Sequence, residues 1–175
     1  MTTTNDNILS DIRVLDLSQG VAGPFCSKLL AGLGAEVVKV EPPGTGDSSR
    51  SSRPFLGGSV TTENSALFSY INTSKKSVTL DPAIPLQAQA IKKLAQDCHI
   101  LVESFPPGYL ESLGMGYDHL IKLNPNRIYV SVTPFGQTGP YSSRPGFASA
   151  CEAMGGFRNP VFPPETTILR FGKCR

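Results

Sequence analysis

The chain has 175 residues, a length that fits one domain with its own hydrophobic core. Charged residues make up 17% of the sequence and the formal net charge is +2, so we expect no clustered basic face and no nucleic-acid partner. The four cysteines lie far apart, without a C-x-x-C pair or a histidine cluster, which argues against zinc and thioredoxin-like motifs and predicts no metal.

Targeting and membrane segments are not expected either. Residues 1–8 are polar and lack a basic stretch followed by a long apolar run, so we expect a disordered N-terminus and no secretion signal. No apolar stretch reaches the roughly 18 residues that a membrane-spanning helix needs. A cytoplasmic protein without a membrane partner is therefore the prediction, with a mitochondrial or peroxisomal location left open.

Strands and helices alternate from the first residues of the predicted domain. Residues 13–17 begin as a strand, and Pro24 suits the first turn of a helix that continues to about residue 31. Gly32 and Gly34 favour a helix C-terminus, and the valine-rich residues 37–40 form a second strand. These elements make a β-α-β unit.

The same alternation continues after a polar interval. Residues 44–65, dense in glycine, serine and threonine, predict an exposed, mobile loop. A strand at 77–80 and a helix of apolar period at 84–95 follow. Further strands are expected at 100–102 and 127–132, because both segments contain apolar runs typical of buried parallel strands. Short helices at 107–113 and 118–123 are expected between them.

This order predicts an α/β fold with a doubly wound, mostly parallel sheet, in which ligands bind at the carboxyl ends of the strands. We expect one domain over residues 9–156 and an irregular tail over residues 157–175. A dinucleotide-binding fold would need G-x-G-x-x-G directly after the first strand, whereas residues 18–23 read SQGVAG. We therefore expect no NAD cofactor.

Three segments together resemble CoA-transferase family III, the carnitine and bile-acid CoA-transferase family, which is related to formyl-CoA transferase and 2-methylacyl-CoA racemase. They read GLGAEVVKVEPPGTGD (residues 32–47), NTSKKSVTLD (72–81) and FGQTGPY (135–141). The resemblance implies a Rossmann-like large domain that is incomplete here, since family members continue for more than the same length again. It also implies acyl-CoA and carboxylic acid substrates, CoA itself as the group transferred, and an interlocked homodimer.

The resemblance further implies which residues contact CoA. They are Val21, Ala22, Lys39, Asn72, Thr73, Ser74, Lys75, Ser104 and Phe105. Phe105 would stack on adenine, within a segment ESFPPG that matches the family's Glu-Asn-Phe-Arg-Pro-Gly in part, because Ser104 replaces the asparagine and Pro106 the arginine. From the residues alone, Lys39 is also interpretable as a structural lysine, and Lys75 with Lys76 as a solvated face.

The resemblance also implies a catalytic aspartate that attacks the donor thioester, so that acyl-enzyme and enzyme-thioester intermediates replace one difficult substitution by several easier ones. By the same resemblance, Ala148 occupies the position of that aspartate. Glu152 is the nearest carboxylate, one helical turn further on and about 6 Å along the axis. Glu152 is therefore the candidate nucleophile, with a structural glutamate as the alternative.

Two alternative functions stay open at this point. Ala148, Ser104 and Pro106 favour a truncated, non-catalytic CoA-binding fragment. A 2-methylacyl-CoA racemase-like protein would use acid/base chemistry at the α-carbon, but its acid and base are not recognisable. His99 and His119 lack a neighbouring nucleophile or second metal ligand, so we expect structural roles for both.

Overall fold

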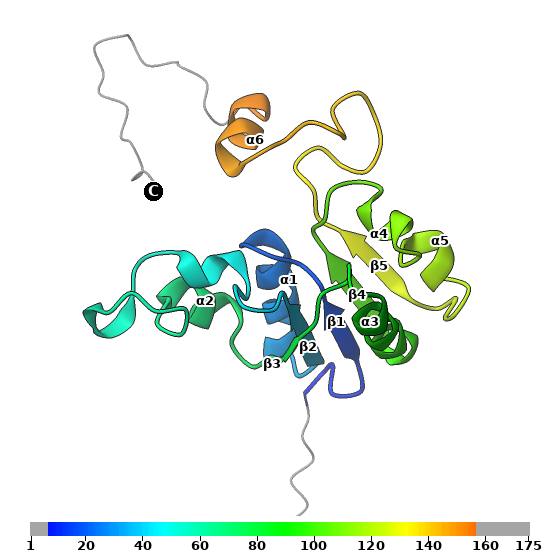
Figure 1. Cartoon of the computed structure of the whole chain (residues 1–175), viewed down its shortest axis with the longest axis horizontal. Helices are drawn as coiled ribbons and strands as arrows, with labels where there is room; N and C mark the ends of the chain where they lie inside the picture. The colour runs from blue at the N-terminus through cyan, green and yellow to red at the C-terminus, as the bar shows by residue number, and fades with distance from the viewer. Residues whose placement is uncertain (1–6, 157–175) are drawn as a thin grey trace, which may run out of the picture. The chain divides into compact units, whose positions relative to one another are not determined.

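The computed structural model describes residues 7–156 (Figure 1). These residues divide into two compact units, with the boundary between Val132 and Thr133, and each unit is described by itself. The predicted tail at 157–175 and most of the predicted disordered N-terminus lie outside the described residues.

The first unit is built on one parallel sheet. Its strands are β1 (Arg13–Asp16), β2 (Glu36–Glu41), β3 (Lys76–Thr79), β4 (Ile100–Glu103) and β5 (Ile128–Ser131). Their order is β3-β2-β1-β4-β5, and every pairing is parallel (Figure 1). The prediction of a doubly wound parallel α/β sheet is confirmed. The chain reverses its direction of winding at β1, so the switch point of the sheet lies between β1 and β4.

Helices cover both faces of the sheet. They are α1 (Ala22–Gly32), α2 (Ala66–Ile71), α3 (Pro85–Asp97), α4 (Tyr109–Ser112) and α5 (Tyr117–Leu120), with the short 3₁₀ helices η1 (Ser48–Ser51) and η2 (Leu56–Gly58). One core cluster joins α3, α4 and α5 to strand residues such as Leu15 and Leu101. The other joins α1 to Val14, Val37 and Val102. Because neighbouring strand residues point to opposite faces, these two clusters are the two sides of the sheet.

The end of α1 has the form that its glycines predicted. The Gly34 amide donates to the Ala31 carbonyl and the Ala35 amide to the Leu30 carbonyl, each at 3.0 Å. Gly34 has φ +102°, so this is a Schellman motif with glycine in the left-handed region. The motif turns the chain directly into β2.

Two sequence predictions need correction. Residues 44–65 are not simply an exposed loop, because Asp47, Ser49 and Ser65 are buried. In addition, Ser65 caps helix α2, which was not predicted from the sequence. The second correction concerns β5, which was predicted to be a buried strand. It lies at the edge of the sheet, with Ile128 58% exposed.

The second unit contains helix α6 (Ala148–Met154), preceded by a glycine-rich connection. The guanidinium of Arg144 lies 4.3 Å from the centre of the Tyr141 ring, and the Phe135 and Tyr141 rings lie 6.2 Å apart. Within the described part of the chain, no helix of either unit has the length and apolar character required to cross a membrane.

Candidate functional site

A cavity of about 190 Å³ opens at the carboxyl ends of the strands in the first unit. It is bounded by residues that follow or end β1, β2, β3 and β4, together with Ile91 of α3. The lining residues are Leu17, Gln19, Val40, Pro42, Leu80, Asp81, Pro82, Ile91, Phe105 and Tyr109. The cavity thus lies at the edge where the sequence analysis expected a ligand, on the face of the sheet that α3 covers.

Aromatic rings form one wall of this cavity. The Phe105 and Tyr109 rings lie 5.0 Å apart with 26° between their planes. The Phe105 amide donates to Glu103 Oε2 at 2.7 Å, which fixes the backbone where β4 ends. Burial raises the pKa of Glu103, while hydrogen bonds from Ser131 and from the Phe105 amide oppose that rise. Both rings line the cavity and are partly buried, and aromatic side chains of this kind can stack on a heteroaromatic ring.

The turn between β1 and α1 crosses the end of the sheet. Gly20 has φ +78°, and a Cβ at Gly23 would lie 2.3 Å from Cβ of Ser18, so both positions require glycine. Val21 and Ala22 are exposed at the start of α1, and no side chain caps this helix. In the first turn of α1, Ala22 and Gly23 carry N–H groups without an intrahelical acceptor, whereas Pro24 has no N–H. Free amide groups at a helix start are of the kind that binds anions.

A buried polar network lies at the same carboxyl end of the sheet, on the face opposite the cavity. Asp16, at the end of β1, accepts hydrogen bonds from both the amide and the hydroxyl of Ser18 and from Ser27 Oγ. Lys75 Nζ lies 3.0 Å from Asp16 Oδ2. Burial would raise the pKa of Asp16, but the charges of Lys39 and Lys75 and the two hydroxyls lower it overall.

Lys39 has its partners inside the protein. Its side chain is 1% exposed, and Nζ lies 2.7 Å from Asp47 Oδ2 and donates to the Ser18 carbonyl at 2.8 Å. Since Val40 lines the cavity, the neighbouring Lys39 points to the opposite face of β2. These contacts favour the structural interpretation of Lys39, and direct contact with a ligand stays a prediction.

Lys75 and Asn72 are hydrogen-bonded to each other. Lys75 Nζ donates to Asn72 Oδ1 at 2.8 Å and to the Pro24 carbonyl at 2.7 Å, so the connection between α2 and β3 is fastened to β1 and α1. Burial lowers the pKa of Lys75 and the charge of Asp16 opposes this. Thr73 and Ser74 are exposed, with φ +64° at Ser74. The structure thus brings Lys39, Asn72 and Lys75 into one network.

A second cluster holds residues 44–65 against the sheet. Glu41, the last residue of β2, pairs with Arg50 through both carboxylate oxygens, at 2.6 Å from Nε and 3.0 Å from Nη2. Arg50 also lies over the Phe68 ring, with 3.6 Å between the guanidinium carbon and the ring centre. Asp16, Glu41 and Asp47 were not predicted from the sequence as site residues. The only local signal for them is their position directly after an apolar strand or within the glycine-rich segment that follows it.

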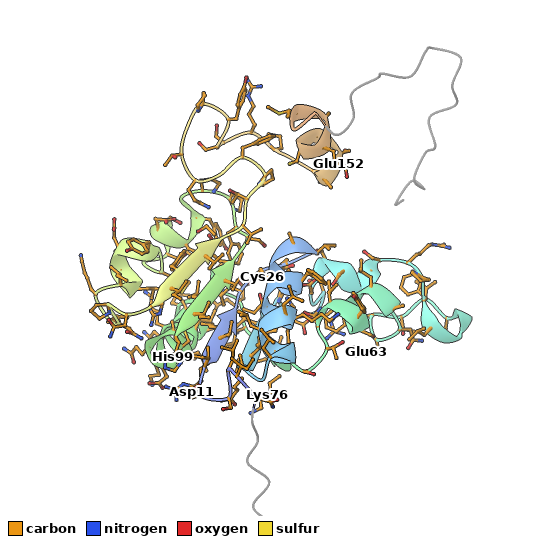
Figure 2. All side chains as sticks on the ribbon, turned by 180° about the vertical axis from the view of Figure 1, so that it is seen from behind. Asp11, Cys26, Glu63, Lys76, His99 and Glu152 are labelled. Atoms are coloured by element: carbon orange, nitrogen blue, oxygen red, sulfur yellow. The ribbon has the colours of Figure 1, made fainter. Side chains whose placement is uncertain are left out.

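Glu152 and His99 belong to other elements of the structure. Glu152 is on α6 in the second unit, where it follows Ala148 by one turn of the same helix (Figure 2). His99 lies at the amino edge of the sheet, where its Nδ1 accepts the Arg13 amide at 3.0 Å, and is labelled there in Figure 2. Among residues 7–156, no group of three or more His, Cys, Asp or Glu side chains is arranged to hold a metal ion.

Comparison with known proteins connects these features to one family. The sequence model of CoA-transferase family III matches residues 9–167. The succinyl-CoA–D-citramalate CoA-transferase of Chloroflexus aurantiacus is 42% identical over 165 residues, which are 94% of this chain and 40% of that protein. The succinyl-CoA:glutarate CoA-transferase of Mus musculus is 41% identical over 164 residues, or 94% of this chain and 37% of that protein.

Solved structures give the same result. A CAIB/BAIF family protein from Brucella suis superposes with a TM-score of 0.82 at 32% sequence identity, over 92% of this chain and 42% of that one. The chain spans about two fifths of the length of the curated relatives described above. The chain belongs to CoA-transferase family III.

Proposed function

We propose that this chain forms the CoA-binding part of an acyl-CoA transferase, which moves CoA between carboxylic acids. Family membership supports the proposal, and the observation that carries it is the cavity at the carboxyl edge, bounded by the loops that follow four parallel strands. In doubly wound sheets this position is the usual ligand site, because the loops diverge at the switch point and leave a crevice.

The parts of CoA match different surfaces around this cavity. The adenine ring would stack on the Phe105–Tyr109 wall, and such contacts contribute about 0.5–1.5 kcal/mol beyond burial. The phosphates would meet the uncapped start of α1 at Val21 and Ala22, where helix amides and the helix dipole favour anions.

The chemistry follows from the reaction class. A carboxylate oxygen attacks the carbonyl carbon of the acyl-CoA and expels the CoA thiolate, which leaves a mixed anhydride. The thiolate attacks the enzyme's own carbonyl, releases the first acid and gives an enzyme thioester, from which the second acid removes CoA through the same steps in reverse. In this chain Glu152 is the candidate nucleophile, since Ala148 has no nucleophilic group.

The relatives suggest which substrates to test first. Two of them are named for succinyl-CoA as donor, with citramalate or glutarate as acceptor. We propose succinyl-CoA as the donor class and small dicarboxylic acids as acceptors. An interlocked homodimer is part of the same proposal, and sedimentation velocity of the 175-residue chain would test it.

Isotope exchange tests the function directly. The purified chain is incubated with succinyl-CoA and ¹³C-labelled glutarate, and labelled glutaryl-CoA is measured by mass spectrometry. Labelled product that forms in proportion to protein concentration is the expected result. Binding of CoA without labelled product from any dicarboxylic acid would instead identify a binding lobe that is not catalytic by itself. A chain that neither binds CoA nor exchanges label would refute the proposal.

A further inference from the structure

Three consecutive backbone groups in the turn after β1 are each held by a side chain from elsewhere in the fold. The Ser18 carbonyl accepts from Lys39 Nζ at 2.8 Å. The Gln19 amide donates to Ser104 Oγ at 2.9 Å. The Gly20 amide donates to Asp47 Oδ1 at 3.2 Å. The three side chains come from β2, from the loop after β4 and from the loop after β2, so the turn is fixed from three sides.

The side chains that hold the turn are themselves fixed. Asp47 is fully buried, its second oxygen pairs with Lys39 at 2.7 Å, and its first oxygen also accepts the amide of Ser49 at 2.8 Å. The Asp47 amide donates to Glu41 Oε2 at 2.9 Å. Asp47 therefore connects the β1–α1 turn to the start of the 44–65 segment and to the end of β2.

This turn lies between the buried network and the cavity. Gln19 lines the cavity, whereas Ser18 and Gly20 are bonded to groups on the network side. Lys39 is buried on the face of the sheet opposite the cavity, so a ligand in the cavity is separated from Lys39 by the turn. Lys39 and Asp47 are thus connected to this edge of the cavity through the backbone of residues 18–20.

We infer that Asp47, Lys39 and Ser104 are positioning residues, which set the β1–α1 turn for CoA and do not themselves carry the contact. This inference rests on the proposed function, since it takes CoA to be the ligand beside the turn. It assigns a role to Asp47, and it changes the role of Lys39 and Ser104 from binding the cofactor to orienting the backbone that binds it.

Ser104 gives the sharpest test because it is only half buried and its change leaves the buried charges intact. Three variants are compared with the wild-type chain: Ser104→Ala removes the acceptor, Ser104→Thr keeps it, and Ser69→Ala removes an exposed serine hydroxyl on α2 as the matched control. Two quantities are measured for each: the hydrogen-exchange rate of the Gln19 amide by NMR, and the Kd for CoA by calorimetry.

We expect Ser104→Ala to speed Gln19 exchange and to raise the Kd for CoA, each by roughly three- to tenfold, the usual worth of one hydrogen bond. Ser104→Thr should restore both values, and Ser69→Ala should change neither. A raised Kd with unchanged Gln19 exchange would overturn the inference, because Ser104 would then contact CoA directly. Faster exchange with an unchanged Kd would also overturn it, because the turn would not matter for binding.

Asp47→Asn provides a second, independent measurement. The asparagine side chain keeps an oxygen that accepts the Gly20 N–H but loses the charge that pairs with Lys39. At the same protein concentration and pH as the wild type, we therefore expect faster hydrogen exchange of the Gly20 amide and a higher Kd for CoA. Unchanged affinity in a folded Asp47→Asn protein would refute the role of Asp47. A wild-type chain that binds no CoA would instead refute the proposed function, a result that the calorimetry of wild type alone identifies.

Discussion

Glu41→Gln tests how strongly the long connection after β2 is attached to the sheet. The Glu41 carboxylate is 4% exposed and accepts from both Nε and Nη2 of Arg50. It also accepts from Ser77 Oγ at 2.6 Å and from the Asp47 amide at 2.9 Å. A glutamine keeps the size of the side chain but removes the charge that Arg50 and the other donors stabilise.

The size of the effect follows from the pKa of Glu41. Burial would raise this pKa, but the hydrogen bonds from Arg50, Ser77 and the Asp47 amide and the charge of Arg50 lower it from 4.5 to about 2. One unit of pKa is worth about 1.4 kcal/mol, so the charged form contributes about 3 kcal/mol to the free energy of unfolding. Because the folded pKa is the lower one, this contribution is present above pH 4.5 and is lost as the pH falls toward 2.

Urea denaturation of the wild type and Glu41→Gln at pH 7, 5, 4 and 3 measures both the size and the pH dependence. We expect a loss of about 3 kcal/mol at pH 7, and a difference between the two proteins that shrinks below pH 4.5. Glu36→Gln is the matched control on the same strand, since Glu36 is 46% exposed and pairs with the exposed Lys76. A Glu41→Gln protein as stable as Glu36→Gln at pH 7, or a difference that grows on acidification, would refute this reasoning.

Three further substitutions have defined expected results. Gly23→Ala places a Cβ 2.3 Å from Cβ of Ser18 and should lower the free energy of unfolding by about 1–3 kcal/mol. Gly32→Ala meets no atom within 4 Å and should stabilise α1 by about 0.5–1 kcal/mol. Equal urea midpoints for the two variants would contradict the close approach at Gly23. Lys39→Met leaves Asp47 buried without its charged partner and should cost about 3–5 kcal/mol, while Lys76→Met on the exposed edge should change the unfolding midpoint little. Ala148→Asp supplies a carboxylate at the first position of α6, where the helix dipole favours it, and should raise label exchange on the order of a hundredfold over Ala148→Asn; equal rates would exclude position 148 as the nucleophile site.

The sequence was sufficient for the order of the five strands, because each is marked by a local apolar run, but it did not predict helix α2. The glycines after α1 predicted the helix end for an equally local reason, since Gly34 takes a positive φ that other residues avoid. The family resemblance rested on short segments of this kind, and the comparisons confirm it.

What the sequence could not give depends on partners that are distant along the chain. Gly20 and Asp47 are 27 residues apart, and Gln19 and Ser104 are 85 residues apart, so no local pattern marks them as partners. Residues 44–65 have the composition of a loop, yet Asp47, Ser49 and Ser65 are buried, and Asp47 and Ser65 bond to residues more than ten positions away. An apolar run likewise does not show how many neighbours a strand has, which is why β5 was predicted to be buried and proved to be an edge strand.

The most direct test of the CoA site is the thermal unfolding midpoint of the 175-residue chain as a function of CoA concentration, with Phe105→Ala as the matched variant. A ligand that binds only the folded state stabilises it by about 2.7 kcal/mol at a hundredfold excess over Kd. We expect one cooperative transition whose midpoint rises with CoA in the wild type and rises less in Phe105→Ala. A midpoint that does not move with millimolar CoA would contradict the assignment of this edge of the sheet to CoA.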